Sequence, residues 1–255
     1  MTGLEMVAVF IAGIAAGTMN TVVGSGTLIT FPTLLAFGVP PVTANVSNTV
    51  GLVPGSLSGA IGYRRELSGQ RKRMVRLGGA SLLGGIGGAV LLLALPAAAF
   101  DALVPVLIAL GCVLVVLQPA IGRRVAARRE SRGSAAPEHG AAWVWCLVFL
   151  TGIYGGYFGA AQGVLLMAVM GIGIQETLQR LNATKNVLAL LVNTVAAAIF
   201  VVVADVDWAV AGLIASGALI GGSVGASVGR RLPPLVLRLI IVLVGVAAMT
   251  QFLLD

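Results

Sequence analysis

Long apolar stretches separated by short polar segments make up almost the whole chain. Eight of these stretches approach the ~20 residues that a helix needs to cross the ~30 Å apolar core of a bilayer. Two further apolar pieces, 27–39 and 163–174, are too short for a full crossing. Each follows a glycine-rich break, and we expect Pro32 to interrupt the first of them. The pattern predicts membrane-spanning helices at residues 4–23, 42–63, 74–95, 100–119, 142–158, 181–204, 208–229 and 233–254.

The composition supports a membrane protein. Apolar residues make up 58% of the chain and charged residues only 10%, whereas about a quarter of an ordinary soluble domain is charged. A chain this apolar cannot hide all its side chains in one globule, so the remainder must face a lipid bilayer. The net charge of +7 does not indicate a nucleic-acid partner, because the basic residues lie between apolar runs rather than on a polar face.

The two halves of the chain resemble each other at a constant offset of 137 residues. The polar run NVSNTV (45–50) aligns with NATKNV (182–187), and the glycine-rich run LLGGIGGA (82–89) aligns with LIGGSVGA (219–226). The Leu-Pro pairs at 95–96 and 232–233 keep the same offset. Because one offset serves three separated blocks, the pattern indicates an internal repeat. Such repeats are typical of secondary transporters.

The distribution of charge predicts how the two halves thread the membrane. Suppose that the two short pieces also cross, which hydrophobic mismatch or local thinning of the bilayer would permit, so that each half has five segments. With the N-terminus outside, all sixteen Lys and Arg residues then lie on the cytoplasmic side, as the positive-inside rule favours. The charges therefore predict an all-α polytopic membrane protein, an inverted repeat of two five-segment halves, each with a short or broken second helix. Repeat 1 is 1–119, a basic cytoplasmic loop is 120–141, and repeat 2 is 142–255, within one transmembrane domain (1–255). An eight-crossing, parallel arrangement would instead move five basic residues outside: Arg180, Lys185, Arg230, Arg231 and Arg238.

Several features are interpreted as structural. No Lys or Arg precedes Arg64, so the start lacks the basic region of a signal peptide, and we expect the first apolar run to be retained. Cys112 and Cys146 show neither a disulfide framework nor a metal spacing, and His139 is expected to be solvated. We therefore expect no metal and no cofactor. The arginines of the 120–141 loop are expected to anchor the topology against anionic lipid.

At this point the residues resemble a known family. The runs GSGTLITFP (24–32), GVPP (38–41) and ANVSN (44–48) are similar to the first-half signature of the sulfite exporter TauE/SafE family, and GIYGGYFGA (152–160) with NATKN (182–186) is similar to its second half. The resemblance covers essentially the whole chain. It implies a multi-pass permease of a bacterial-type inner membrane for a small sulfur-containing or organic anion, such as sulfite or a sulfonate. One departure is Ala161-Gln162, which stands where the family tends to have a further glycine.

The glycine-rich breaks are the expected binding site for the anionic substrate. Transporter sites tend to lie near the midplane, where broken helices of two repeats meet. Helix N-termini there offer free N–H groups to an anion, and glycine lets the backbone approach it closely. The alternative is that polar side chains in membrane helices only join or cap helices. The candidate substrate-binding residues are Asn20, Gly24, Ser25, Gly26, Asn45, Ser47, Asn48, Gln162, Asn182, Thr184, Lys185 and Asn186.

Lys185 is the most specific candidate for a substrate-binding residue, because it is the only cationic side chain well inside a predicted apolar segment, about one turn from the start of that segment. An intramembrane charge is costly and by default indicates function, here a counter-charge for an anion. The alternative is that its long stem snorkels to the cytoplasmic face. No Asp, Glu or His falls in the middle of a span, so we expect no carboxylate-based proton coupling and disfavour a cation carrier.

Other classes of protein remain as alternatives. A membrane-embedded enzyme would need a catalytic constellation, and the sequence contains no HExxH motif, Ser/His/Asp set or paired intramembrane carboxylates. We therefore expect no enzymatic activity. A channel or a non-transporting membrane scaffold is the main alternative to a transporter. The glycine-rich run at 84–88 suits tight contact between helices, within one chain or in a homo-oligomer.

Overall fold

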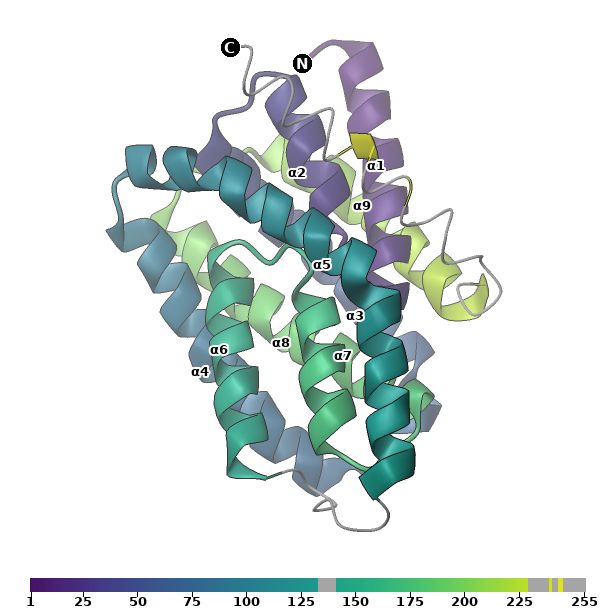
Figure 1. Ribbon diagram of the computed structural model, residues 1–255. Coiled ribbons are helices and arrows are strands. Elements are labelled where there is room, and N and C mark those ends of the chain that lie inside the picture. Colours follow the sequence, from purple (N-terminus) through teal and green to yellow (C-terminus); the bar gives the residue numbers. More distant parts are fainter. Residues whose placement is uncertain (133–140, 229–238, 240–242, 245–255) are drawn as a thin grey trace.

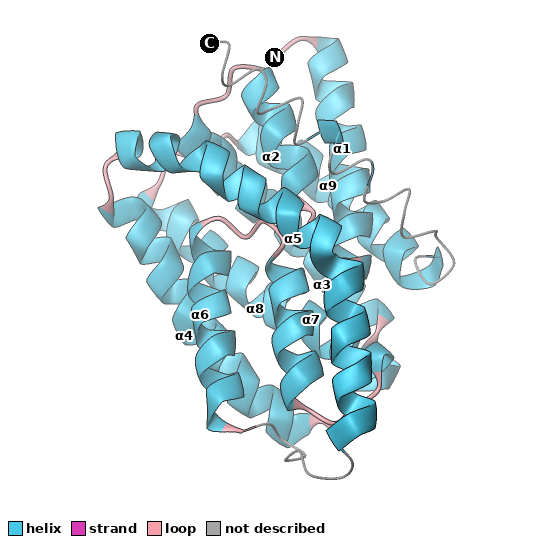
Figure 2. Cartoon of the chain, in the orientation of Figure 1, coloured by secondary structure: helices cyan, strands magenta, loops and turns pink. Residues whose placement is uncertain are grey.

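The computed structural model describes residues 1–132, 141–228, 239, 243 and 244, and these form an all-helical protein (Figure 1). No strand occurs among these residues, as Figure 2 shows. The prediction of an all-α membrane protein is therefore confirmed. In chain order the elements are α1 (Gly3–Val22), α2 (Thr27–Ala36), α3 (Pro41–Gly62), the short 3-10 helix η1 (Arg64–Leu67), α4 (Arg71–Ala94), α5 (Ala97–Arg132), α6 (Ala142–Tyr157), α7 (Gln162–Gly173), α8 (Leu178–Val203) and α9 (Trp208–Val228).

Most predicted spans coincide with these helices, and two expectations are wrong. Pro32 lies inside α2 and does not interrupt it. The expected loop at 120–141 is helical as far as Arg132, because α5 continues past the apolar span into the basic run. The predicted span 233–254 lies outside the described residues, apart from three isolated positions, and so do His139, Arg230, Arg231 and Arg238.

Five of the described helices are long and apolar enough to cross a membrane: α1, α4, α5 (over residues 97–124), α8 and α9. Helix α3 is long enough to cross a membrane but too polar for this set, because it contains Asn45, Ser47, Asn48 and Ser56. All four of these side chains are buried inside the protein. The helix packs against α8 and α9, and its exposed side carries the apolar residues Leu57 and Ile61. The polar residues of this helix therefore lie on its buried side, where they can pair with neighbouring helices.

Two helical hairpins organise the interior. Helices α1 and α2 pack against each other, as do α6 and α7. Each hairpin also packs against a glycine-rich helix of the other half: α1 packs against α9, and α6 packs against α4. Figure 1 shows the α6–α7 hairpin opening towards the lower end of the view, while the N-terminus that begins α1 lies at the upper end. The contacts are close enough that a Cβ at Gly221 would lie 2.0 Å from the Ile14 carbonyl oxygen, and one at Gly84 would lie 2.2 Å from that of Phe149.

Several contacts recur at positions that the 137-residue offset relates. The Ser47 hydroxyl accepts a hydrogen bond from the backbone N–H of Asp207 (2.9 Å), and the offset-related pair is also bonded, with Thr184 donating to the Gln70 side chain (3.2 Å). The Asn193 amide donates to the Ser56 hydroxyl at 3.1 Å, and these two positions are themselves 137 residues apart. Contacts between related positions therefore occur at several points where the two halves of the chain meet.

Candidate functional site

The tips of the two hairpins meet, and we call the meeting segments, 24–26 and 159–163, the break junction. The backbone N–H of Gly163 donates to the carbonyl oxygen of Gly24 at 3.0 Å. A Cβ at Gly24 would lie only 2.3 Å from the Cα of Gly163, so no larger residue fits without separating the two backbones. The expectation that the two glycine-rich breaks lie together is confirmed by this contact. Glycine is required here because the main chains touch directly.

The junction also requires an unusual backbone conformation. Gly24, Gly159 and Ala161 adopt positive φ angles of 86°, 78° and 58°. Ala161 is the residue that precedes α7, and it is the only non-glycine among the described residues with a positive φ. An L-residue with a side chain is disfavoured in this left-handed region by about 1–2 kcal/mol. Alanine at position 161 therefore places strain beside the break junction.

Lys185 reaches into the junction from α8. Its side chain is fully buried, with 0% exposure, so snorkelling to the cytoplasmic face is ruled out. The ammonium donates to the carbonyl oxygens of Asn20 (3.1 Å) and Thr21 (3.0 Å), in the last turn of α1. The final carbonyls of a helix lack partners within the helix and carry partial negative charge, which favours a cation. Lys185 is the eighth residue of α8, deeper than the single turn that the sequence suggested.

The two sequence-related asparagines, Asn45 and Asn182, bind the opposite hairpins. The Asn45 amide donates to the carbonyl oxygen of Tyr157 at the end of α6 (3.0 Å). The Asn182 amide donates to that of Thr21 near the end of α1, at the limiting distance of 3.5 Å. Each half of the chain therefore supplies an amide that caps the broken helix of the other half. This explains why the motif begins with asparagine in both halves.

Several buried polar atoms near the junction have no hydrogen-bond partner within the protein. They are the Ser25 hydroxyl, the Gln162 amide nitrogen, the Asn45 amide oxygen and the Asn186 amide nitrogen. An unpartnered buried donor or acceptor costs about 1–3 kcal/mol, so native proteins rarely keep one without a reason. Ser25 and Gln162 belong to the breaks themselves, and Asn186 follows Lys185 along α8. These groups are available to a bound ligand.

The remaining candidates have partners elsewhere. Ser47 and Thr184 hold the loops before α9 and α4, through the bonds given above. Asn48 donates to the Thr27 hydroxyl (3.3 Å) and accepts from the Thr30 hydroxyl, so it ties α3 to α2. Asn20 donates to the Ser56 hydroxyl at 3.1 Å, beside the bond from Asn193. Gly26 lies against the Ala16 carbonyl, where a Cβ would come within 2.5 Å.

Sequence reasoning missed a partly buried ionic network that joins the start of α4 to the start of α8. Arg73 is only 3% exposed, and its guanidinium contacts the Glu176 carboxylate at 3.1 Å. Arg180 contacts the same carboxylate at 3.0 Å. Partial burial by itself would raise the pKa of Glu176, but the hydrogen bonds from Arg73 and from the Thr177 backbone, together with the charge of Arg180, outweigh it and lower that pKa. No spacing rule joins these residues in the sequence, since Arg73 and Glu176 lie in different halves.

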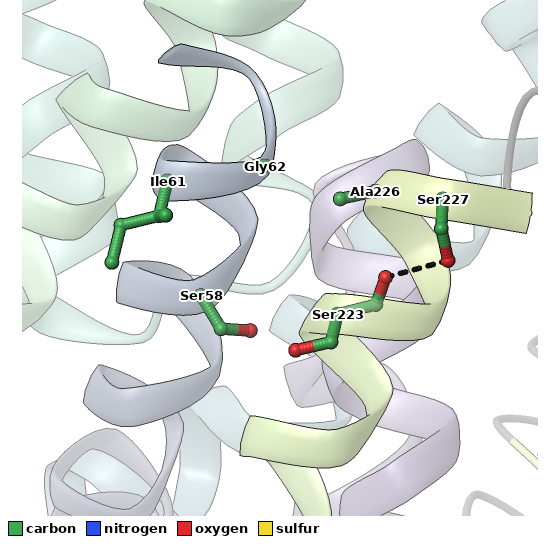
Figure 3. Close-up of a pocket in the computed structure, with 6 residues that line it drawn as sticks. All are labelled: Ser58, Ile61, Gly62, Ser223, Ala226 and Ser227. Atoms are coloured by element: carbon green, nitrogen blue, oxygen red, sulfur yellow. Dashed lines mark hydrogen bonds between the residues drawn. The ribbon is translucent and has the colours of Figure 1, made fainter.

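A separate pocket of about 390 Å³ lies between α3 and α9 (Figure 3). Its hydroxyl groups already have partners: Ser58 and Ser223 donate to the Leu219 carbonyl at 3.0 and 3.1 Å, and Ser227 donates to that of Ser223 at 2.9 Å. The described residues of the lining therefore offer a ligand neither a charge nor a free donor. The break junction is the better candidate site.

Comparisons with known proteins relate the chain to a family model and to membrane transporter proteins. The family model described as "Sulfite exporter TauE/SafE" matches residues 9–252. The chain is 26% identical to the "Probable membrane transporter protein ORF9" of Sinorhizobium sp, over 96% of this chain and 91% of that protein. It is also 26% identical to the "Probable membrane transporter protein YfcA" of Escherichia coli (strain K12), over 88% of this chain and 78% of that protein. No solved structure matches the chain.

Proposed function

This chain belongs to the sulfite exporter TauE/SafE family and is a multi-pass membrane transporter, and we propose that it exports a small sulfur-containing or organic anion, such as sulfite or a sulfonate, across a bacterial-type inner membrane. The observation that carries this proposal is Lys185. Its buried ammonium lies beside the meeting point of two helix breaks and, among the described residues, donates to two neutral backbone carbonyl groups. A membrane protein rarely buries a charge that serves no function.

The substrate would bind between the two hairpin tips. Gly163 lies directly beside Lys185, since a Cβ there would be 3.0 Å from the Cδ of the lysine. An anion near this point would have the ammonium on one side and the unpartnered donors of Ser25 and Gln162 in the breaks. The N-terminus of α7 begins at the same place and contributes partial positive charge. Lys185 would then supply the counter-charge, and neutral donors would complete the shell.

Movement of the substrate would require the hairpin tips to separate. The side chains of Ser25, Asn45 and Lys185 have 0% exposure, so the junction is closed to both sides in this conformation. We propose that the two halves are inverted repeats that rock about their shared axis and open the junction alternately to each side. The recurrence of the Ser47–Asp207 contact as Thr184–Gln70, and the Ser56–Asn193 contact between related positions, support this arrangement.

The direct contact of Arg73 with Glu176 also supports inversion. It joins the first turn of α4 to the loop before α8, so both lie on one face. In a parallel, eight-crossing arrangement these two positions would lie on opposite faces. The membrane potential would then favour export, because moving one negative charge out of a negative interior is downhill by about 2.3 kcal/mol per 100 mV. No coupling ion is needed for that direction.

Flux into and out of proteoliposomes tests this function. The purified protein should give saturable flux of sulfite and of a small sulfonate, and Lys185→Ala should reduce that flux at least tenfold. Lys72→Ala is the matched control, because Lys72 is exposed at the start of α4 and lies outside the site. Flux that does not saturate would indicate a channel, and no flux of any small anion would indicate a scaffold. Full activity of the Lys185→Ala protein would refute the site.

A further inference from the structure

The number of charges buried at the break junction limits the net charge of the ligand that it can bind. Among the described residues, the charged side chains that are buried are those of Arg73 and Lys185. Arg73 is paired with the Glu176 carboxylate. The ammonium of Lys185 contacts two backbone carbonyl oxygens, which are dipoles and carry no net charge. The junction therefore has one positive charge that no acidic side chain of the described residues neutralises.

The two halves of the chain contribute unequally to this charge. The position that the repeat relates to Lys185 is Asn48, whose neutral amide is already engaged by the hydroxyls of Thr27 and Thr30. The unpartnered donors nearby, Ser25 and Gln162, are also neutral. A lysine at both related positions would have given a site with two positive charges. This chain offers only one.

We propose that the break junction selects its anion by charge, and that it takes monovalent oxyanions in preference to divalent oxyanions of the same shape, with Lys185 as the residue that sets this preference. The inference rests on the proposed anion transport. A monovalent anion would neutralise the ammonium and enter a closed, low-dielectric site as a balanced pair. A divalent anion would leave one negative charge buried without a partner, and an unpaired buried charge carries a large desolvation penalty. Neutral hydrogen-bond donors offset only part of that penalty.

Methanesulfonate and sulfate are suitable probes, because both are tetrahedral oxyanions of sulfur and they differ in charge. The protein is reconstituted in proteoliposomes, and the exchange of each labelled anion is measured below saturation. The membrane potential is clamped at zero with equal potassium and an ionophore, so that the different charges do not change the driving force. We expect methanesulfonate to exchange at least tenfold faster than sulfate. Equal rates, or faster exchange of sulfate, would overturn the charge preference while leaving anion transport in place.

Two variants test the role of Lys185 in this preference. Lys185→Gln should slow the exchange of methanesulfonate and bring the ratio of the two rates close to one. Asn48→Lys adds a second ammonium at the repeat-related position and should shift the ratio towards sulfate by at least tenfold. An unchanged ratio in a folded Lys185→Gln protein would overturn the assignment to Lys185. If the folded wild-type protein exchanges neither probe nor sulfite, the proposed function fails, and the charge preference fails with it.

Discussion

Replacing Gly163 by alanine tests the central contact of the site. Gly163 is the second residue of α7, and its backbone is not in the left-handed region, so a methyl group adds no conformational strain. That methyl would lie 2.4 Å from the Cα of Gly24 and 3.0 Å from the Cδ of Lys185. Ordinary contacts begin at 3.4 Å, so the two breaks must separate by about 1 Å (3.4 minus 2.4) to accommodate it. The separation also stretches the hydrogen bond from Gly163 to Gly24.

The expected net effect is a loss of about 1–2 kcal/mol in stability. Overpacking of a close contact costs about 1–3 kcal/mol, and the better helix propensity of alanine returns about 0.5–1 kcal/mol. For a chain of this length, that loss corresponds to a decrease of about 2–8 °C in Tm. Thermal unfolding of the purified protein in detergent measures the decrease. We also expect anion flux in proteoliposomes to fall more than stability does, because the displaced atoms belong to the site.

Gly79→Ala provides the control for this substitution. Gly79 lies in α4, and a Cβ there meets no atom within 4 Å. The same change of residue should therefore leave Tm unchanged or raise it slightly, and flux should stay at the wild-type level. If Gly163→Ala and Gly79→Ala behave alike in both assays, the hairpin tips do not touch in the working protein, and the proposed site loses its basis.

Three further predictions concern the neighbouring charges and the topology. Lys185→Met, which keeps the stem but removes the donors, should destabilise the protein by about 1–3 kcal/mol in thermal unfolding, because two α1 carbonyls lose the bond from the ammonium and Thr21 keeps only the 3.5 Å bond from Asn182; a Tm equal to that of wild type would contradict the buried contact. Glu176 has a lowered pKa in the folded state, so its stabilisation is present above the ordinary carboxyl pKa and is lost as pH falls through the lowered value. Glu176→Gln should therefore lower stability by about 1–2 kcal/mol at pH 7 and flatten the decline of Tm on acidification; a profile parallel to wild type would contradict this. Single cysteines at Ala36 and Gln175, both exposed, in a background without Cys112 and Cys146, should react with an impermeant maleimide from opposite sides of the membrane, and labelling from one side would refute the inverted repeat.

The helices could be predicted from the sequence, because apolar runs of membrane length are a local property of the chain. The predicted run at 181–204 lies within α8 except for its last residue, and the short piece at 163–174 corresponds closely to α7. The predicted end of α5 is wrong because it was placed where the sequence changes from apolar to basic residues. The helix itself continues through the basic segment as far as Arg132. A change of solvent along the chain does not by itself end a helix.

The site could be predicted only in outline. The repeat and the glycine-rich breaks indicated which segments meet, and the contact of Gly24 with Gly163 bears this out. The partners of Lys185 could not be predicted, because they are backbone carbonyls of α1, which no side-chain pattern specifies. The pairing of Arg73 with Glu176 depends in the same way on how the two halves pack. The residue types indicate which hydrogen bonds and ion pairs a side chain can make, whereas the long-range packing of the helices determines its actual partners.

The differences between the two halves matter more for transport than their likeness. The repeat relates Arg73, Glu176 and Arg180 to Val210, Val39 and Thr43, so the ionic network on one face has uncharged residues at the related positions. The bond between Gln70 and Thr184 recurs as that between Asp207 and Ser47, so the two faces keep similar neutral contacts. An inverted backbone alone would give both faces equal access to the site. The direction and charge selectivity proposed above would then arise where related side chains differ, as they do at Asn48 and Lys185.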